Sequence, residues 1–356
     1  MKKSLDRKAY ARLITNVEGT SLSQEDRDFL TRRELAGVIL FTRNYENRRQ
    51  LERLVESIRA VDSSLLICVD QEGGRVQRLK TGFTEIPEMA KLGEAYQLNA
   101  ETALKTARRV GWLLAAELLA AQIDFSFTPV VDIDFDTSSI IGNRALSNDA
   151  QVVSQLAAAL VQGMQSAGMK SCAKHFPGHG GIGEDSHLAA ASDSRSWQQL
   201  CEKDLIPYHA VTNAYDSVMT AHIQYPEVDE PIATYSKRWI NKILRGEMMF
   251  QGCVFSDDLT MKGAAVDEEE MQKPNYKKRT ELALKAGCDA IIVCNDRSAA
   301  QSACDSIADF VERQGPTKRS ICVKTALRAK RYHDLAQLVA SPVYKAAKQS
   351  VGALAG

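Results

Sequence analysis

Short apolar segments rich in β-branched residues recur along the chain, and stretches with the period of an amphipathic helix separate them. A short apolar run bounded by turn residues is typical of a buried strand. We predict eight strands, at Leu13–Val17, Gly37–Phe41, Leu65–Val69, Phe125–Val130, Met169–Ala173, Val218–His222, Cys253–Ser256 and Ala290–Cys294. Strands that alternate with helices predict a parallel sheet, and eight repeats fit a closed (β/α)8 TIM barrel better than an open doubly wound sheet.

The helical period is clearest between the fourth and fifth predicted strands. Asp149 is a suitable N-cap there, and Gly168 is a suitable C-terminal stop. Between them one face is apolar, with Val152, Leu156, Leu160, Val161 and Met164. No linker or internal repeat divides the chain. We therefore expect one α/β barrel domain over residues 1–340 and a peripheral, poorly ordered tail over residues 341–356.

Composition and charge exclude several functional classes. Basic and acidic residues balance at 45 each, so no net field favours nucleic acid or an anionic membrane. The apolar run near the N-terminus spans about five residues, too few for a signal peptide, and no window approaches the roughly 18 apolar residues of a transmembrane helix. The eight cysteines are scattered without a CxxC pair, which indicates reduced core thiols. We expect a cytoplasmic monomer with no nucleic-acid partner and no membrane insertion.

Polar residues capable of chemistry follow the predicted strands directly. The C-terminal ends of all strands in a barrel meet on one face, where catalytic groups sit, so these residues should gather there. They are Glu18, Asp70, Asp132, Lys174, His175, His222, Asp257, Asp258, Asn295 and Asp296. Loops are polar in any case, and this simpler interpretation fits Glu18, Asn295 and Asp296 best.

The stretch KHFPGHGGIGEDSH, Lys174 to His187, gathers three of the chain's six histidines, two acids and four glycines. Proline and glycine disfavour a regular helix or central strand, so we predict a shaped loop after the fifth strand. Gly178, Gly180 and Gly183 match the pattern GxGxxG. Pro177 and the DSH sequence interrupt the helix that a dinucleotide site requires, which argues against that site.

Two further interpretations of this loop remain open. Asp185 and His187 could form a catalytic pair, because imidazole exchanges a proton near neutrality and a carboxylate can orient the ring and stabilise its charged form. Imidazole and carboxylate groups also suit zinc or iron. A metal site on the loop would use His175, His179, Asp185 and His187.

Two carboxylates in the sequence FSDDLTM follow the seventh predicted strand directly. Successive side chains of an extended segment point to opposite sides, so only one of Asp257 and Asp258 should face the barrel mouth. An inward carboxylate on a rigid strand end is a credible nucleophile toward the C1 atom of a sugar. The structural alternative is an N-cap for the turn that follows.

The sequence DQEGGRVQR follows the third predicted strand. Its adjacent glycines allow a close backbone turn, and Asp70 with Arg75 and Arg78 would flank a place for a polyhydroxyl ligand. A carboxylate accepts hydrogen bonds from paired hydroxyls, and arginine offers a rigid fork of donors. The structural alternative is a salt bridge between Asp70 and an arginine.

Taken together, these residues resemble glycoside hydrolase family 3, and within it the single-domain bacterial β-N-acetylglucosaminidases of peptidoglycan recycling. The resemblance spans Val17 to about Cys294, with its blocks in the expected order. The blocks are ILFTRNY from Ile39, VDQEGGRVQR from Val69, FTPVVDID from Phe127, IGNRALS from Ile141, KHFPGHGGIGEDSH from Lys174 and GCVFSDDLTM from Gly252.

The resemblance implies a (β/α)8 barrel and a retaining double displacement that removes terminal N-acetylglucosamine from β-linkages. The natural substrates would be N-acetylglucosaminyl-1,6-anhydro-N-acetylmuramyl fragments of peptidoglycan, with no metal and no organic cofactor. Carried over motif by motif, it implies Asp257 as nucleophile, His187 as acid/base, Asp185 as the partner of His187, and Asp70, Arg78, Arg144, Lys174 and His175 as sugar-binding residues.

Two departures from the family pattern bear on the rim of the site. The loop reads GGIGED where a polar, threonine-bearing stretch is expected, and its glycines would permit the loop to move His187 over the sugar. The segment Asp267–Asn275 is unusually acidic and could alter the rim. A related β-glucosidase or glycoside phosphorylase remains an alternative within the class, and a metal-dependent TIM-barrel hydrolase remains one outside it.

Overall fold

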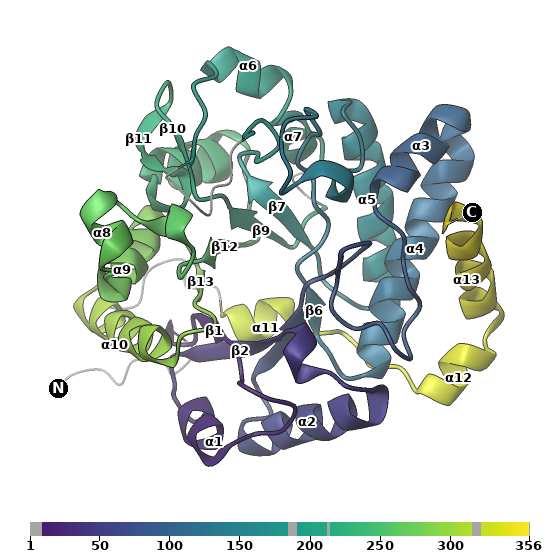
Figure 1. Cartoon of the computed structure of the whole chain (residues 1–356), viewed down its shortest axis with the longest axis horizontal. Coiled ribbons are helices and arrows are strands. Elements are labelled where there is room, and N and C mark those ends of the chain that lie inside the picture. The colour runs from purple at the N-terminus through teal and green to yellow at the C-terminus, as the bar shows by residue number, and fades with distance from the viewer. Residues whose placement is uncertain (1–8, 184–190, 212–213, 315–321, 356) are drawn as a thin grey trace.

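The centre of the molecule is an eight-stranded parallel sheet that curves into a nearly closed barrel surrounded by helices (Figure 1). The computed structural model describes residues 9–183, 191–211, 214–314 and 322–355. Parallel bridges from Phe125 to Lys170 and from Val130 to Lys174 join the two edge strands, β6 and β7. In spatial order the strands are β6 (Phe125–Ser126), β3 (Leu66–Val69), β2 (Leu35–Leu40), β1 (Leu13–Thr15), β13 (Ala290–Ile292), β12 (Cys253–Asp258), β9 (Ser217–Thr220) and β7 (Cys172–Phe176).

The eight predicted strands coincide with the eight barrel strands, which confirms the TIM-barrel prediction. The observed boundaries differ where polar residues end the apolar runs. β7 continues to Phe176, so Lys174 and His175 lie within the strand and not in the predicted loop. β12 continues to Asp258. Hydropathy changes at these polar residues, whereas backbone pairing with the neighbouring strands continues through them.

Helices pack outside the barrel, and α5 shows why they form where they do. Asp149 accepts hydrogen bonds from the backbone N–H groups of Gln151 and Val152, and Gly168 ends the helix with a positive φ of 111°. Both predicted caps of α5 are therefore confirmed. The helices are α1 (Gln24–Leu30), α2 (Arg48–Val61), α3 (Ala90–Leu98), α4 (Ala100–Ala120), α5 (Ala150–Ala167), α6 (Trp197–Glu202), α7 (Ile206–Val211), α8 (Glu268–Gln272), α9 (Tyr276–Ala286), α10 (Arg297–Gln314), α11 (Val323–Leu327), α12 (Leu335–Ala340) and α13 (Pro342–Ala355).

Shorter elements occupy the connections between barrel strands and helices. A two-stranded hairpin and a three-stranded sheet lie outside the barrel sheet. The hairpin is β4 (Gln71–Gly73) with β5 (Val76–Gln77), and the second sheet is β8 (Ala191–Ser192), β10 (Ile223–Tyr225) and β11 (Asp229–Ile232). The segment Arg238–Glu247, labelled η5, is a π-helix, and single 3-10 turns are η2 (Thr42–Asn44), η3 (Gly142–Arg144), η4 (Ala233–Tyr235) and η6 (Lys262–Ala264).

The helix α11 closes one end of the barrel. Its Val323 and Leu327 are fully buried among side chains of the barrel interior. Lys324 pairs with Asp62 and with Ser64, which lie in the segment leading into β3. Helix α11 therefore closes the end of the barrel where the strands begin. The end where the strands finish is left open for a binding site.

The C-terminal segment lies on the outside of the molecule, against α4 (Figure 1). It is a helix, α13, and not the poorly ordered tail that its small residues suggested. Tyr344, Ala347 and Val351 are buried, and the Tyr344 hydroxyl donates to the Glu117 carboxylate at 2.7 Å. All eight cysteines are free, and six of them are buried. No helix in the described ranges is long and apolar enough to cross a bilayer.

Candidate active site

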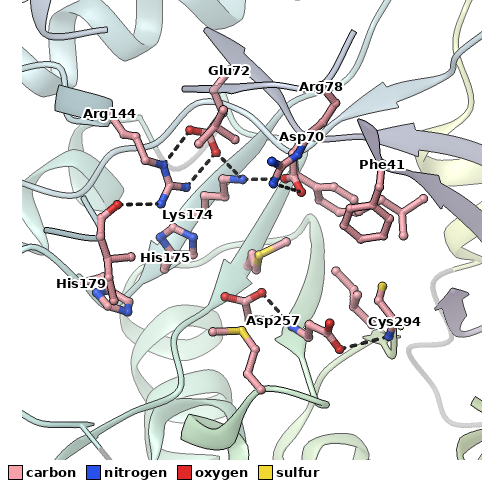
Figure 2. Close-up of a pocket in the computed structure, with 18 of the residues that line it drawn as sticks. Phe41, Asp70, Glu72, Arg78, Arg144, Lys174, His175, His179, Asp257 and Cys294 are labelled. Atoms are coloured by element: carbon pink, nitrogen blue, oxygen red, sulfur yellow. Dashed lines mark hydrogen bonds and ion pairs between the residues drawn. The ribbon is translucent and has the colours of Figure 1, made fainter. Parts of the chain in front are cut away.

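A cavity of about 360 Å³ opens at the C-terminal ends of the barrel strands (Figure 2). This volume is in the range of small-molecule sites. Apolar side chains such as Phe41, Phe127 and Met261 share its lining with charged groups. Six residues that the sequence singled out also line it: Asp70, Arg78, Arg144, Lys174, His175 and Asp257. The other two, Asp185 and His187, lie outside the described residues.

A chain of alternating charges forms one wall of the cavity (Figure 2). Arg144 binds Glu72 through two parallel hydrogen bonds of 2.8 and 2.9 Å. The Lys174 ammonium lies 2.7 Å from Glu72 and 2.9 Å from Asp70. Arg78 continues the chain, with its guanidinium 4.0 Å from Asp70. Residues from three separate segments are thus held together by ion pairs.

Burial and these ion pairs together set the protonation of the wall. Burial by itself would raise the pKa of Glu72, but Lys174 and Arg144 outweigh it and lower that pKa to about 2. Burial would lower the pKa of Lys174, and Asp70 and Glu72 outweigh it, so the pKa of Lys174 is raised. Glu72, Lys174 and Arg144 are therefore charged at neutral pH. A rigid array of charged donors and acceptors can bind the hydroxyl groups of a sugar.

A second buried pair lies beside this wall. The Asp132 carboxylate is 2.7 Å from His175 Nδ1 and also accepts hydrogen bonds from the backbone N–H groups of His175 and His179. Burial would raise the pKa of Asp132, but the two histidines outweigh it and the pKa is lowered. His179 also lines the cavity, and burial together with the nearby His175 lowers its pKa to about 4. His179 is therefore neutral at pH 7.

Both carboxylates of the DD pair line the cavity, so the prediction that only one of them would is wrong. The pairing register of β12 with β13 shifts between Phe255 and Asp258, and such irregularities turn side chains away from strict alternation. Burial would raise the pKa of Asp257, but the electrostatic influence of His175 and His222 outweighs it and the pKa is lowered. Burial raises the pKa of Asp258 to about 6.

The two carboxylates of the DD pair have different hydrogen bonds. Asp258 accepts from the backbone N–H groups of Thr260 and Cys294, so it also organises the strand end. Asp257 Oδ1 accepts only from its neighbour's backbone N–H, at 2.7 Å, and Oδ2 has no hydrogen-bond partner in the described part of the chain. Asp257 is thus the carboxylate with an oxygen free for a ligand.

Three of the four loop glycines lie close to neighbouring segments. A Cβ atom on Gly180 would lie 1.7 Å from the Ile133 carbonyl oxygen, and one on Gly178 would lie 2.5 Å from the Asp204 carboxylate. Gly181 is similarly close to Arg195. These three glycines therefore allow the start of the loop to pack tightly. Among the four, only Gly183 has no contact shorter than 3.4 Å.

Several strand-end residues do not line the cavity. His222 bonds to Thr234 and to the backbone oxygen of Asp258, so it supports the strand end from behind. Asp296 accepts from the backbone of Ala299 at the start of α10, which agrees with its structural interpretation. Glu18 is exposed, and Asn295 and the acidic segment 267–275 also stay outside the cavity lining.

The loop after β7 was also interpreted as a metal site. The described residues contain no group of three or more histidine, cysteine, aspartate or glutamate side chains placed to hold a metal ion. Two of the four ligands proposed for the loop, Asp185 and His187, lie outside that range. The other two, His175 and His179, lie side by side with ring centroids 5.6 Å apart.

Sequence reasoning missed two buried carboxylates in the site. Glu72 belongs to the DQEGGR motif, but only Asp70 and the arginines attracted attention. Asp132 was noted as a strand-end residue without a role. The motif itself offered one signal for Glu72. A glutamate beside two glycines, directly after a buried strand, is itself expected to be buried, and buried acids are usually paired with a cation. Their partners lie far away in sequence and could not be read from it.

Comparisons with known proteins agree with this architecture. Residues 4–323 match the family model for the glycosyl hydrolase family 3 N-terminal domain. The chain is 42% identical over 335 residues to a β-hexosaminidase of Hydrogenovibrio crunogenus. The matched stretch covers 94% of this chain and 91% of that protein. The structure is similar to native NagZ from Neisseria gonorrhoeae, with a TM-score of 0.88, 36% identity, and 97% and 98% of the two chains covered.

A second solved structure is similar to the same degree and contains a sugar. It is NagZ from Neisseria gonorrhoeae in complex with N-trifluoroacetyl-D-glucosamine, with a TM-score of 0.87 and 36% identity over 97% of this chain and 98% of that chain. The family match and the similarity over nearly the whole chain lead to one conclusion: the chain belongs to glycosyl hydrolase family 3, and within that family to the β-hexosaminidases.

Proposed function

We propose that this protein is a retaining exo-β-N-acetylglucosaminidase that removes terminal N-acetylglucosamine from peptidoglycan fragments. The observation that carries the proposal is the Asp257 carboxylate. It stands at the end of a rigid strand, its pKa is lowered so that it is ionised at neutral pH, and one of its oxygens is free to face the cavity. Such a group suits nucleophilic attack on a sugar carbon.

The charged wall supports the sugar-binding part of the proposal. Asp70 would accept hydrogen bonds from hydroxyl groups, while Lys174 and Arg78 on either side of it would donate. Arg144 would donate from the next position along the wall. The N-acylglucosamine bound in the similar Neisseria structure supports an N-acetylglucosaminyl substrate for this chain. The cavity size fits one terminal sugar residue.

The reaction would proceed as a double displacement. Asp257 attacks C1 and forms a covalent glycosyl-enzyme, while His187 gives its proton to the leaving oxygen with Asp185 as its partner. His187 then takes a proton from water, and that water displaces Asp257 from C1. Both steps invert C1, so the product retains the β configuration. Most retaining glycosidases place two carboxyl groups roughly 5 Å apart, and here a histidine would replace one of them.

The experiment that tests the proposal is trapping with a 5-fluoro N-acetylglucosaminyl donor, followed by peptide mass spectrometry. The fluorine slows the second step, so the glycosyl-enzyme should accumulate with its label on Asp257. Fragmentation between Asp257 and Asp258 separates the two candidates. The expected result is a label on Asp257 in the wild type and none in the Asp257→Asn variant.

Two variants sharpen this test. Asp258→Asn removes the neighbouring carboxyl group and should still be labelled. His187→Ala should retain turnover of substrates with very good leaving groups far better than turnover of poor ones. A label on any residue other than Asp257 would overturn the nucleophile assignment, and an equal loss on both substrate types would overturn the role of His187.

A further inference from the structure

Asp132 has an unusual set of hydrogen-bond partners for a buried carboxylate. Its side chain is fully buried and lies in the segment after β6, whereas its partners lie on β7 and in the loop beyond it. It accepts from the backbone N–H of His175 at 3.1 Å, from the backbone N–H of His179 at 2.8 Å and from the ring of His175 at 2.7 Å. A single carboxylate therefore holds both the backbone and the imidazole of His175.

This arrangement decides which ring nitrogen of His175 carries the proton. The carboxylate is ionised at neutral pH because the histidines outweigh its burial and lower its pKa. An ionised carboxylate only accepts hydrogen bonds, so Nδ1 of His175 must donate. Nε2, on the opposite side of the ring, is then left for the cavity that His175 lines.

His175 lies among the groups that would hold the sugar. It lines the cavity together with Asp257, and its chain neighbour Lys174 pairs with Asp70. Asp132 and His179 lie beside it, and His179 is kept neutral because burial and His175 lower its pKa. Figure 2 shows the His175 ring on the same side of the cavity as the Asp257 carboxylate.

We propose that Asp132 is a positioning residue: it fixes the tautomer and orientation of His175 so that the unprotonated Nε2 faces the cavity and accepts a hydrogen bond from a sugar hydroxyl. This inference rests on the proposed function, because it assigns His175 as a sugar-binding residue. Asp132 does not line the cavity. It acts through His175, from the opposite side of the ring.

The variant Asp132→Asn tests this role. An amide can still accept from the two backbone N–H groups, but its NH2 group cannot accept from Nδ1–H, so the ring is driven to the wrong tautomer. We expect kcat/KM for an aryl N-acetylglucosaminide to fall by at least about 10-fold, as tautomer control in comparable Asp–His pairs is costly to lose. The loss should lie mainly in KM, because a wrongly oriented Nε2 no longer accepts a hydrogen bond from the sugar, whereas kcat should change little.

A double-mutant cycle separates positioning from mere structural support. If Asp132 acts through His175, then Asp132→Asn should cost little further activity in a His175→Gln background. Asp124→Asn is the matched control, because Asp124 is a buried carboxylate directly before β6 and accepts a hydrogen bond from the backbone N–H of Ile67. It should lower the melting temperature while leaving KM unchanged.

The protonation of the His175 ring can also be measured in the wild-type protein, which does not depend on the folding of Asp132→Asn. NMR of 15N-histidine-labelled protein, with His175 assigned by its absence in His175→Gln, should show a proton on Nδ1 of His175 at neutral pH. A ring protonated on Nε2 alone would overturn the inference, as would an unchanged KM in Asp132→Asn or additive effects in the cycle. A wild type that does not hydrolyse N-acetylglucosaminides would instead overturn the proposed function.

Discussion

At the scale of single residues, Glu72 is the buried carboxylate that pairs with both Lys174 and Arg144. It is 2% exposed, and it binds two cations that would otherwise face each other without compensation. A buried ion pair contributes modestly as a whole, but removing one partner leaves an uncompensated charge. Glu72 thus determines whether Lys174 and Arg144 can occupy the same wall of the cavity.

The variant Glu72→Gln should weaken both folding and sugar binding. The amide cannot neutralise Lys174 and Arg144, so we expect the free energy of unfolding to fall by about 3 kcal/mol or more. KM should rise at least about 10-fold, because the donors to the sugar lose their fixed positions, which corresponds to about 1.4 kcal/mol. Urea denaturation followed by circular dichroism and steady-state kinetics measure the two effects.

Glu94→Gln is the matched control for this prediction. Glu94 pairs with Lys91 on an exposed helix surface, where an ion pair contributes little. This change should alter the free energy of unfolding by no more than about 0.5 kcal/mol. If Glu72→Gln proved as mild as the control, the charged wall would not depend on Glu72.

At the scale of elements, the helices α4 and α5 are brought together by glycines. A Cβ atom on Gly111 of α4 would lie 2.1 Å from the Leu160 carbonyl oxygen, and one on Gly163 of α5 would lie 2.0 Å from the Arg108 carbonyl oxygen. The two helix backbones therefore touch at both points. This contact places α5, and with it the start of β7, against the barrel.

Replacing either glycine by alanine should destabilise the protein, although alanine is the better helix former. In an exposed helix the change from glycine to alanine stabilises by roughly 1 kcal/mol. At Gly111 or Gly163 the added methyl group collides with backbone atoms that cannot rotate away, and overpacking of this kind costs about 1 to 3 kcal/mol. The free energy of unfolding in urea should fall for Gly111→Ala and for Gly163→Ala.

The same substitution at Gly352 controls for helix propensity. Gly352 lies in α13 with no atom within 4 Å of an added Cβ, so Gly352→Ala should raise the free energy of unfolding by about 0.5 to 1 kcal/mol. Opposite signs at Gly111 and Gly352 are the expected pattern. A stabilising effect at Gly111 would contradict the backbone contact between α4 and α5.

At the scale of the whole molecule, the barrel collects ionisable groups from distant segments, and their perturbed pKa values couple stability to pH. Burial and His175 lower the pKa of His179 from 6.5 to about 4. Between these values the unfolded chain binds the proton more tightly, so this contribution to stability is complete above pH 6.5 and is lost as the pH falls toward 4. Asp258 acts in the opposite sense, because burial raises its pKa to about 6.

The variant His179→Gln isolates the histidine contribution. In the wild type, His179 should lower the free energy of unfolding by up to about 3 kcal/mol between pH 6.5 and pH 4. Glutamine does not titrate, so the variant should show a shallower decline over that range. Urea denaturation at a series of pH values measures both slopes, and equal slopes in the two proteins would contradict the assignment of a neutral, buried His179.

The features of the fold that could be predicted from the sequence depend on residues that are close together in the chain. The eight strands and the caps of α5 depend on residues close together in the chain, such as Asp149 and its neighbours. The barrel mouth could be predicted because parallel strands bring their C-terminal ends to one face. The family resemblance, which the comparisons confirm, rests likewise on contiguous motifs.

Several features of the site depend on contacts that no local pattern contains. Asp257 and Asp258 both reach the cavity because the strand register shifts beside them. The hydropathy pattern of a strand contains no information about its register with a neighbouring strand. Gly180 reads as a flexible residue, yet the carbonyl oxygen of Ile133 occupies the space where its side chain would be. Both differences arise from a neighbouring segment.

The sequence by itself determined the order of strands and helices, the caps of α5, and which polar residues stand at the strand ends. Only the tertiary structure decided which of these residues meet: Glu72 with Lys174 and Arg144, and Asp132 with His175. Ion pairs and hydrogen bonds act over a few ångströms in space, whereas these partners are separated by tens of residues along the chain. Their charge states follow from burial and proximity, which exist only after the barrel has closed.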